Sequence, residues 1–153
     1  MAAPTVIPGT KLLVLIGAGG DSPGSPDVFN EPCGLTTKNF TLNASTNTTL
    51  IPDCIDPSLP AWEAKDVNAL SAEVTGNGVM AVEAFHAWLD WYLGAQERQA
   101  RIQLVSPVAL PLSLGYFQGS FILSKLTYNG VRGQKVMIDI TMVNNGVLVF
   151  VPA

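Results

Sequence analysis

Polar and apolar residues alternate along much of the chain with the two-residue period of a strand that has one buried face. In residues 68–75, for example, Leu70, Ala72 and Val74 are separated by polar side chains. Other segments are short runs rich in apolar, β-branched and aromatic residues, which are also typical of strands. Together these patterns predict strands over residues 11–16, 35–42, 68–75, 101–105, 120–128, 134–143 and 147–151.

The apolar period changes to three and four residues between positions 79 and 93, which predicts an α-helix that ends at Gly94. Apolar side chains, among them Phe85, Trp88 and Trp91, cover most of the circumference of this helix. A helix of this kind is buried on more than one side. Because one sheet of a small protein covers only one side, we expect the other side to meet a second subunit.

The segment 43–66 is rich in Thr, Asn and Pro and has few apolar residues. This composition predicts a long loop without regular structure. A loop of this length inside a compact domain usually has a function of its own. We therefore expect it to reach a neighbouring subunit.

The order of the elements defines the fold class. Strands follow one another without the alternating helices of a parallel sheet, and Asn144-Asn145-Gly146 predicts a tight hairpin turn between the last two strands. A chain of 153 residues has the length of one domain. We therefore expect residues 1–153 to form a single, mainly antiparallel β-sandwich or half-barrel with one flanking α-helix.

Composition narrows the functional classes. Hydrophobic residues make up 48% of the chain and charged residues 13%, about half of the usual charged share of ~25%. This excludes an intrinsically disordered chain, which needs low hydrophobicity and high charge. The formal net charge of -4 argues against a surface that grips nucleic acid, because such surfaces are built from clustered Lys and Arg. A weakly charged, apolar protein of this kind hides surface against partner copies.

Candidate catalytic chemistry is sparse. His86 is the only histidine, and Asp90 lies four residues later, so the two side chains share one helix face. No nucleophile motif accompanies them, and the chain lacks the further ligands of a metal site. The segment 17–20 is rich in glycine but does not complete the dinucleotide-binding pattern. We therefore expect no catalytic site, no metal and no cofactor.

The two cysteines, Cys33 and Cys54, permit at most one internal disulfide, and the sequence does not decide whether they pair. Free thiols are the ordinary state in a protein assembled in a cytosol. The apolar run at residues 12–16 is far shorter than the ~20 residues that span a bilayer. We therefore expect no membrane insertion by this chain.

Several short motifs follow one another in a recognisable order and cover nearly the whole chain. They are the strand 12–16 with its glycine-rich break, the Thr-rich strand 35–42, Ile51-Pro52-Asp53-Cys54, Asp56-Pro57, Ala61-Trp62-Glu63, Gly76-Asn77-Gly78, Trp88-Leu89-Asp90-Trp91, and Gly119-Ser120-Phe121-Ile122-Leu123 with the turn that ends at Gly146. In order and spacing the set resembles the tail tube (major tail) protein family of long, non-contractile-tailed phages and related tail-like particles.

The resemblance implies a structural virion protein. Six copies would close into a ring, and their sheets would join into an intersubunit β-barrel. Stacked rings would form the tail tube, the conduit for genome DNA during ejection. The implied partners are further copies of the chain, a tape-measure protein, a tail terminator and distal tail proteins, with DNA in the lumen only transiently and without specific binding. The implied location is the virion, with assembly in the host cytoplasm.

The resemblance also suggests which residues act in assembly. Strands 68–75, 120–128 and 134–143 would line the channel, with Glu73 and Asp139 as lumen charges, although alternation alone does not say which face points inward. The loop 43–66 would contact an adjacent ring or subunit. The candidate interface residues are Phe85, Trp88, Trp91, Trp62, Pro52 and Asp53.

Two alternatives from other classes stay open at this stage. One is a small β-sandwich module that binds a sugar or peptide on its tryptophans. The other is a small enzyme that uses His86 and Asp90. Assembly into rings or tubes supports the tail tube hypothesis, whereas a monomer at high concentration favours one of the alternatives.

Overall fold

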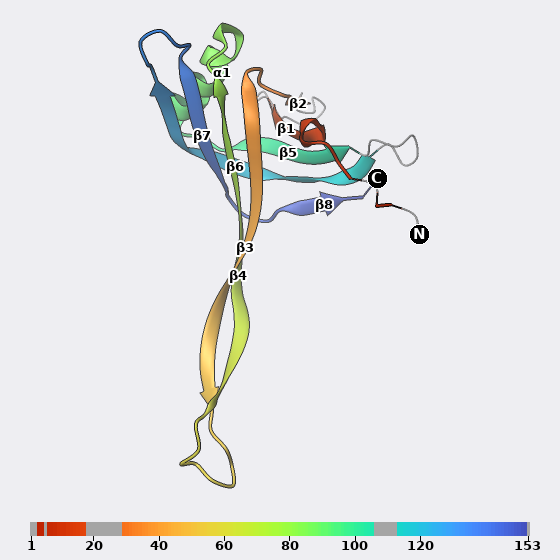
Figure 1. Cartoon of the computed structure of the whole chain (residues 1–153), viewed down its shortest axis with the longest axis vertical. Coiled ribbons are helices and arrows are strands. Elements are labelled where there is room, and N and C mark those ends of the chain that lie inside the picture. The colour runs from red at the N-terminus through yellow and green to blue at the C-terminus, as the bar shows by residue number, and fades with distance from the viewer. Residues whose placement is uncertain (1–2, 5, 18–28, 106–112, 153) are drawn as a thin grey trace.

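The computed structural model describes residues 3–4, 6–17, 29–105 and 113–152. The glycine-rich break at residues 18–20 therefore lies outside the described residues. The described elements are a 3-10 turn η1 (Gly9–Lys11), the helix α1 (Val82–Gly94) and the strands β1 (Leu12–Gly17), β2 (Phe29–Asn30), β3 (Leu35–Ile51), β4 (Trp62–Val79), β5 (Arg98–Val105), β6 (Ser113–Asn129), β7 (Met137–Asn144) and β8 (Val149–Val151) (Figure 1).

The strands form one antiparallel sheet in the order β2-β1-β5-β6-β7-β4-β3, with β8 also paired to β6. β6 is shared by both halves of the sheet: its first part pairs with β5 and its last part pairs with β7. In Figure 1 the half with β1, β5 and β8 runs across the half with β3, β4 and β7. The sheet described here is not closed, and the expected mainly β, antiparallel fold with one helix is confirmed.

The core lies between the two halves of the sheet and the helix. On β4 and β7 it contains alternate residues, which is the pattern that predicted these strands. The register places Val74 opposite Met142, so the buried faces of the two strands coincide. The buried residues are Val14, Ile16, Ala72, Val74, Ala84, Trp88, Trp91, Ala100, Ile102, Phe121, Leu123, Ile138, Ile140 and Met142.

The helix begins three residues later than the periodicity predicts, at Val82 instead of residue 79. The backbone before it is still held by the sheet, because the N–H of Val79 donates to the Gly34 carbonyl and the N–H of Met80 donates to the Val136 carbonyl, both at 2.9 Å. At the other end Gly94 is the last helical residue, and Ala95 takes the left-handed conformation at φ 50°. Sheet hydrogen bonds therefore delay the start of the helix.

The segment 43–66 is not an unstructured loop, and this prediction is wrong. β3 and β4 stay in register from the Asn43–Ser71 pair as far as the Ile51–Trp62 pair, with one irregularity beside Ser45, so only residues 52–61 lack strand structure. Threonine and other β-branched residues suit an extended backbone even without a buried face. The hairpin projects from the rest of the molecule in Figure 1, and we call residues 43–71 the arm.

The predicted hairpin at Asn144-Asn145-Gly146 is also wrong. β7 pairs with β6 at residues 121–129, and β8 then pairs with the same side of β6 at residues 116–118. The two strands therefore follow one another along β6 instead of folding back. The break is fixed by local hydrogen bonds, since the N–H of Asn145 donates to the Ser120 carbonyl at 2.7 Å and the Asn144 amide donates to the Gly146 carbonyl at 3.0 Å.

Candidate assembly surfaces

Trp88 and Trp91 lie in the core of the subunit, with 1% and 2% of their surface exposed. Their rings stack with centroids 6.1 Å apart, and the Trp91 indole N–H donates to the Gln96 carbonyl at 2.9 Å. Side chains enclosed in this way offer no surface to a second subunit. The prediction that these two tryptophans form an interface is therefore corrected: both stabilise the subunit itself.

Part of the exposed surface of α1 is nevertheless apolar, beside the exposed Glu83, His86 and Asp90. Phe85 is half-buried, and its ring packs on that of Tyr128 with centroids 6.0 Å apart. Val82, Tyr92 and Leu93 are exposed on the same helix. Apolar residues therefore lie on more than one side of the helix, as the sequence indicates. The large apolar side chains that face outward are these three and part of Phe85. The period alone cannot say which of the two apolar stripes meets the sheet.

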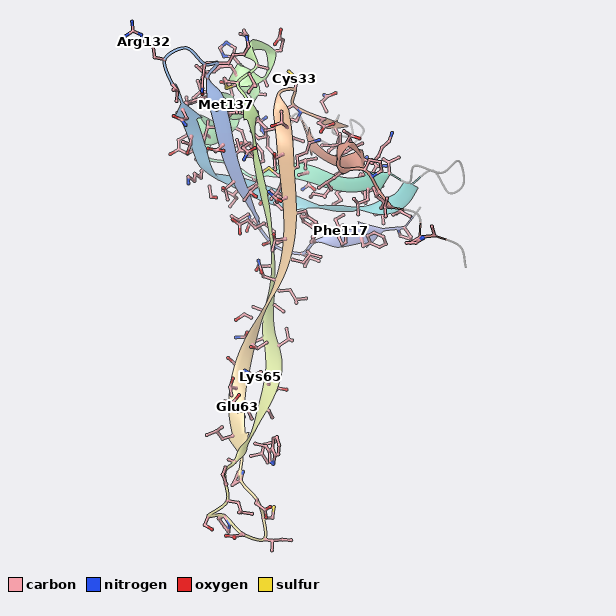
Figure 2. All side chains as sticks on the ribbon, viewed as in Figure 1. Cys33, Glu63, Lys65, Phe117, Arg132 and Met137 are labelled. Atoms are coloured by element: carbon pink, nitrogen blue, oxygen red, sulfur yellow. The ribbon has the colours of Figure 1, made fainter. Side chains whose placement is uncertain are left out.

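The arm contacts nothing else among the described residues along most of its length. Every residue from 43 to 71 is exposed except Ala64, which is half-buried. Figure 2 shows the side chains of Glu63 and Lys65 standing out from it into open space. The large apolar residues exposed on the arm are Leu50, Ile51, Ile55, Leu59, Trp62, Val67 and Leu70, with Trp62 at 84% and Ile55 at 95%. This much apolar surface on one projection is typical of an interaction site.

The end of the arm is a structured turn. The Asp53 carboxylate accepts hydrogen bonds from the backbone N–H groups of Ile55 at 2.7 Å and Asp56 at 3.0 Å. These bonds, that from Asp56 first, hold the pKa of Asp53 below its ordinary value. The Ser58 hydroxyl and then the Ser58 N–H lower the pKa of Asp56 in the same way. Pro52, Asp53 and Trp62, the three candidates on this segment, are all exposed, and the acids there bond to their own loop.

An apolar groove of about 400 Å³ lies where the arm leaves the body of the molecule. The rings of Phe117 and Phe150 form one wall, with centroids 4.9 Å apart. No charged side chain lines this groove. Its lining residues are Leu42, Asn43, Leu70, Ser71, Ala72, Phe117, Asn144, Gly146, Val147, Leu148 and Phe150. This groove cannot be recognised in the sequence, because its lining comes from the separate strands β3, β4, β6 and β8.

Two of the open strand edges in the described part of the chain bound the half of the sheet that contains β3, β4 and β7. There β3 pairs with β4 on one side only. On β6 the pairing with β5 stops at Phe121, so residues 122–129 have a partner, β7, on one side only. Open edges present unpaired N–H and C=O groups to which another strand can add. A four-stranded segment, β3-β4-β7-β6, is therefore bounded by an open edge on each side.

The face of this segment that points away from the core is polar. Glu73 and Asp139 both lie on it, because residues of odd number on β4 and β7 face outward together in the observed register. Asp139 is exposed and Glu73 is half-buried. The residues that share this face by register are mostly polar: Thr37, Asn39, Thr41, Asn43, Ser71, Glu73, Thr75, Asn77, Val79, Ile122, Lys125, Thr127, Asn129, Met137, Asp139, Thr141 and Val143.

A second cleft, of about 410 Å³, lies between α1 and the end of β1, with β2, residues 31–33 and the start of β5 also in its lining. The rings of Trp88 and Trp91 contribute to its wall but are almost completely covered, so neither can stack on a sugar or peptide. His86 and Asp90 are exposed on α1, and no hydrogen bond between them occurs among the described interactions. Neither alternative from the sequence therefore gains a built site here.

Other chemistry is limited in the part of the chain that the structure covers. No group of three or more His, Cys, Asp or Glu side chains is placed to hold a metal ion there. No helix among the described residues has both the length and the apolar character needed to cross a membrane. Cys33 and Cys54 are both exposed and unpaired. They lie toward opposite ends of the β3–β4 hairpin, so an internal disulfide, which needs Cα atoms within about 7 Å, is excluded.

Known proteins with a similar sequence or fold belong to tail tubes and related assemblies. The sequence matches the family described as phage tail tube protein over residues 6–150. The tail of an empty gene transfer agent particle, refined with C6 symmetry, has a similar fold with a TM-score of 0.70 and 17% identity, covering 95% of this chain and 99% of that one. No protein with curated annotation matches the chain in sequence.

Two further solved structures are similar in fold. The SPP1 tail tube gives a TM-score of 0.66 at 11% identity, over 97% of this chain and 80% of the other. A chain of the sheath-tube complex of an extracellular contractile injection system gives 0.62 at 14% identity, over 97% and 93%. At these identities the likeness is one of fold.

Proposed function

Because the chain belongs to the phage tail tube protein family and has a structural role in the tail tube, we propose that six copies close into a ring and that stacked rings enclose the conduit for DNA. Six is the symmetry of the gene transfer agent tail that the subunit resembles. The observation that carries the proposal is the four-stranded segment β3-β4-β7-β6, which has two open edges and one polar face.

Ring closure follows from the two edges. β3 of one copy pairs with residues 122–129 of β6 in the next copy, so that every subunit gives one edge and receives one. Closing the barrel in this way covers both of these strand edges. The chain then gains backbone hydrogen bonds that the lone subunit lacks, which supports assembly as the stable state.

The polar face of the segment lines the lumen. Thr, Asn and Ser dominate it, with Glu73 and Asp139 as acids and Lys125 as a base. A lining of this kind has little attraction for phosphates, because strong binding of DNA depends on neutralising them with clustered Lys and Arg. The genome therefore passes through without being held. Glu73 and Asp139 act as the lumen charges.

The arm joins neighbouring rings, and the exposed side of α1 joins neighbours at the outside of the tube. Pro52, Asp53 and Trp62 act at the end of the arm, and Phe85 acts on the helix. The arm suits this role because its apolar residues have no cover within the subunit. In this proposal residues 43–66 have the connecting role that the sequence suggested, as a paired hairpin.

The remaining partners follow from the position of a tube within a tail. The tube is built around a tape-measure protein and meets a terminator at one end and distal tail proteins at the other. The subunit catalyses no reaction. It assembles in the host cytoplasm and resides in the virion.

Electron microscopy of the purified chain tests the proposal directly. We expect rings and hollow tubes with six-fold symmetry, and native mass spectrometry should give the hexamer as the smallest closed species. Folded material that stays monomeric at high concentration, in conditions that favour polymerisation, would contradict the proposal.

A further inference from the structure

The apolar groove at the base of the arm needs a partner that carries apolar side chains and no requirement for a charged contact. Leu70 is 77% exposed beside it, and Val147 is 82% exposed on its rim. No charged side chain is available in its lining to bind a polar ligand. Covering these side chains removes apolar area from water and therefore favours binding.

The end of the arm has the matching chemistry. Ile55, Leu59 and Trp62 are exposed there. The acids Asp53 and Asp56 accept hydrogen bonds from the turn itself, so these bonds need no partner in the receiving surface. The end of the arm can therefore enter an uncharged groove without losing those bonds.

The lengths of the arm and the body match as well. From Ser71 to Trp62 the arm has nine residue steps of paired strand, or about 30 Å, and the loop 52–61 adds to it. From Ala72 to Val79 the same strand runs for seven steps through the body, or about 23 Å. The β6–β7 turn adds to that length at the far end. When two bodies lie end to end, an arm that follows the next body therefore ends near the base of that copy's own arm.

We propose that the end of the arm of one subunit docks into the groove at the base of the arm of a subunit in the next ring. This inference rests on the proposed stacking of rings and names the surface that receives the arm. A subunit cannot fill its own groove, because its paired arm projects away from β6 and β8, which contribute to the groove (Figure 1). Each ring thus covers apolar surface that the next ring leaves open.

The β6–β7 turn is the rival receiving surface. It lies at the opposite end of the molecule from the arm, where Figure 2 labels Arg132. Arg132 and Lys135 on this turn offer positive charge to the acidic loop 52–61. A contact there would be electrostatic and would leave the groove empty. The two surfaces are far apart along the molecule, so a cross-link distinguishes them.

Disulfide trapping provides the test, with the native Cys54 as the probe at the end of the arm. In a Cys33→Ser parent, Cys54 is the only thiol. A second thiol is added at the groove by Val147→Cys or, in the matched control, at the opposite end by Val131→Cys. Tubes are assembled under reducing conditions, oxidised with a small-molecule disulfide and separated on a denaturing gel without reductant.

We expect the Val147→Cys tubes to give a ladder of covalent oligomers, since each copy then carries one thiol at the arm and one at the groove. The Val131→Cys tubes and the parent should give no ladder. A ladder from Val131→Cys, or none from Val147→Cys in tubes that assemble normally, overturns the docking site while leaving the tube intact. A parent that forms no tubes overturns the proposed function and the docking site with it.

A second variant tests the apolar character of the contact. Ile55→Asp should raise the concentration needed for tube formation by about tenfold or more, because it puts a charged carboxylate in place of an apolar side chain that docking removes from water. Ile55→Leu, the matched control, should leave that concentration nearly unchanged. If Ile55→Asp tubes form as readily as the parent, Ile55 is not buried by assembly and the inference fails.

Discussion

At the scale of single residues, the three tryptophans have opposite roles. Trp88 and Trp91 are enclosed by the body of the subunit, whereas Trp62 stands on the arm with 84% of its surface exposed. An aromatic ring of this size loses favourable burial when it stays in water. We therefore expect Trp88 and Trp91 to determine the stability of the subunit and Trp62 to act in the association of folded subunits.

This division predicts different outcomes for two alanine substitutions. Trp88→Ala should lower the free energy of unfolding by about 3–5 kcal/mol, because it leaves a cavity in the core. Trp62→Ala should change that free energy by less than about 0.5 kcal/mol but weaken tube formation. Thermal unfolding followed by circular dichroism measures the first effect, and sedimentation measures the second.

Tryptophan fluorescence provides the control for the same pair. Assembly of the wild-type chain should shift the emission to shorter wavelength as Trp62 leaves water, and Trp62→Phe should abolish the shift. A shift that persists in Trp62→Phe would place the change in environment at Trp88 or Trp91 and contradict the division.

The sequence predicts individual core residues well where the alternation crosses the body. Ala72, Val74, Ile138 and Met142 are buried, as their spacing indicates. Leu70 continues the same alternation but is 77% exposed, because β4 has passed beyond the body at that point. Periodicity reports which side chains share a face. It does not report how far the surface that covers the face extends.

At the scale of elements, the arm shows why an exposed hairpin escapes detection from sequence. A strand is recognised by one buried face, and residues 43–66 are almost all exposed, so no two-residue period arises there. What remains is a preference of Thr for extended backbone, which is weak. The turn at Asn144-Asn145-Gly146 is misleading for a related reason: the local signal is present, but β8 pairs with β6 and not with β7.

The arm should be removable without loss of the fold. Replacing residues 47–66 by Asn-Gly joins Thr46 to Val67, which are opposite each other in the register, through a turn that suits a two-residue hairpin. The shortened subunit should unfold at nearly the same temperature as the parent and form rings that do not stack. Circular dichroism and electron microscopy measure the two properties.

A variant that replaces the same residues with a flexible Gly/Ser linker of equal length serves as control. It keeps the chain length but removes the paired strands and the apolar end of the arm, so it too should fail to stack. Long tubes from either variant would show that the arm does not connect rings.

At the scale of the whole molecule, the outward face of the four-stranded segment has few charged residues. The outward face of β3-β4-β7-β6 carries Glu73, Asp139 and Lys125 among neutral polar residues. In the proposed ring of six subunits, which has the symmetry of the related tail, every position occurs six times. A substitution on this face is therefore repeated six times in each ring. We therefore expect a small change in charge on this face to change strongly the affinity of the tube for DNA.

Reversing the two acids should convert the tube into one that retains DNA. Glu73→Lys with Asp139→Lys should produce tubes that bind short duplex DNA at low salt and release it steeply as salt rises, because binding falls with the number of phosphates neutralised. The DNA should resist nuclease. Glu73→Gln with Asp139→Gln should bind far less.

An external control distinguishes the lumen from the outer surface. Glu83→Lys with Glu97→Lys changes the same amount of charge at exposed positions away from this face. DNA bound by those tubes should be digested. Nuclease-sensitive DNA on the Glu73→Lys, Asp139→Lys tubes would show that the polar face does not line the channel.

The single arm also gives the polymer a direction. If each arm docks into a groove of the next ring, as we propose, subunits with one projecting hairpin stack head to tail and the two ends of the tube differ. One terminus would expose six arms without a groove to bind, and the other would expose six grooves without an arm. A protein that ends the tube at the terminus with free arms would need a surface like the groove. A protein that ends it at the other terminus would need a surface like the end of the arm. The two ends would therefore need two different capping surfaces.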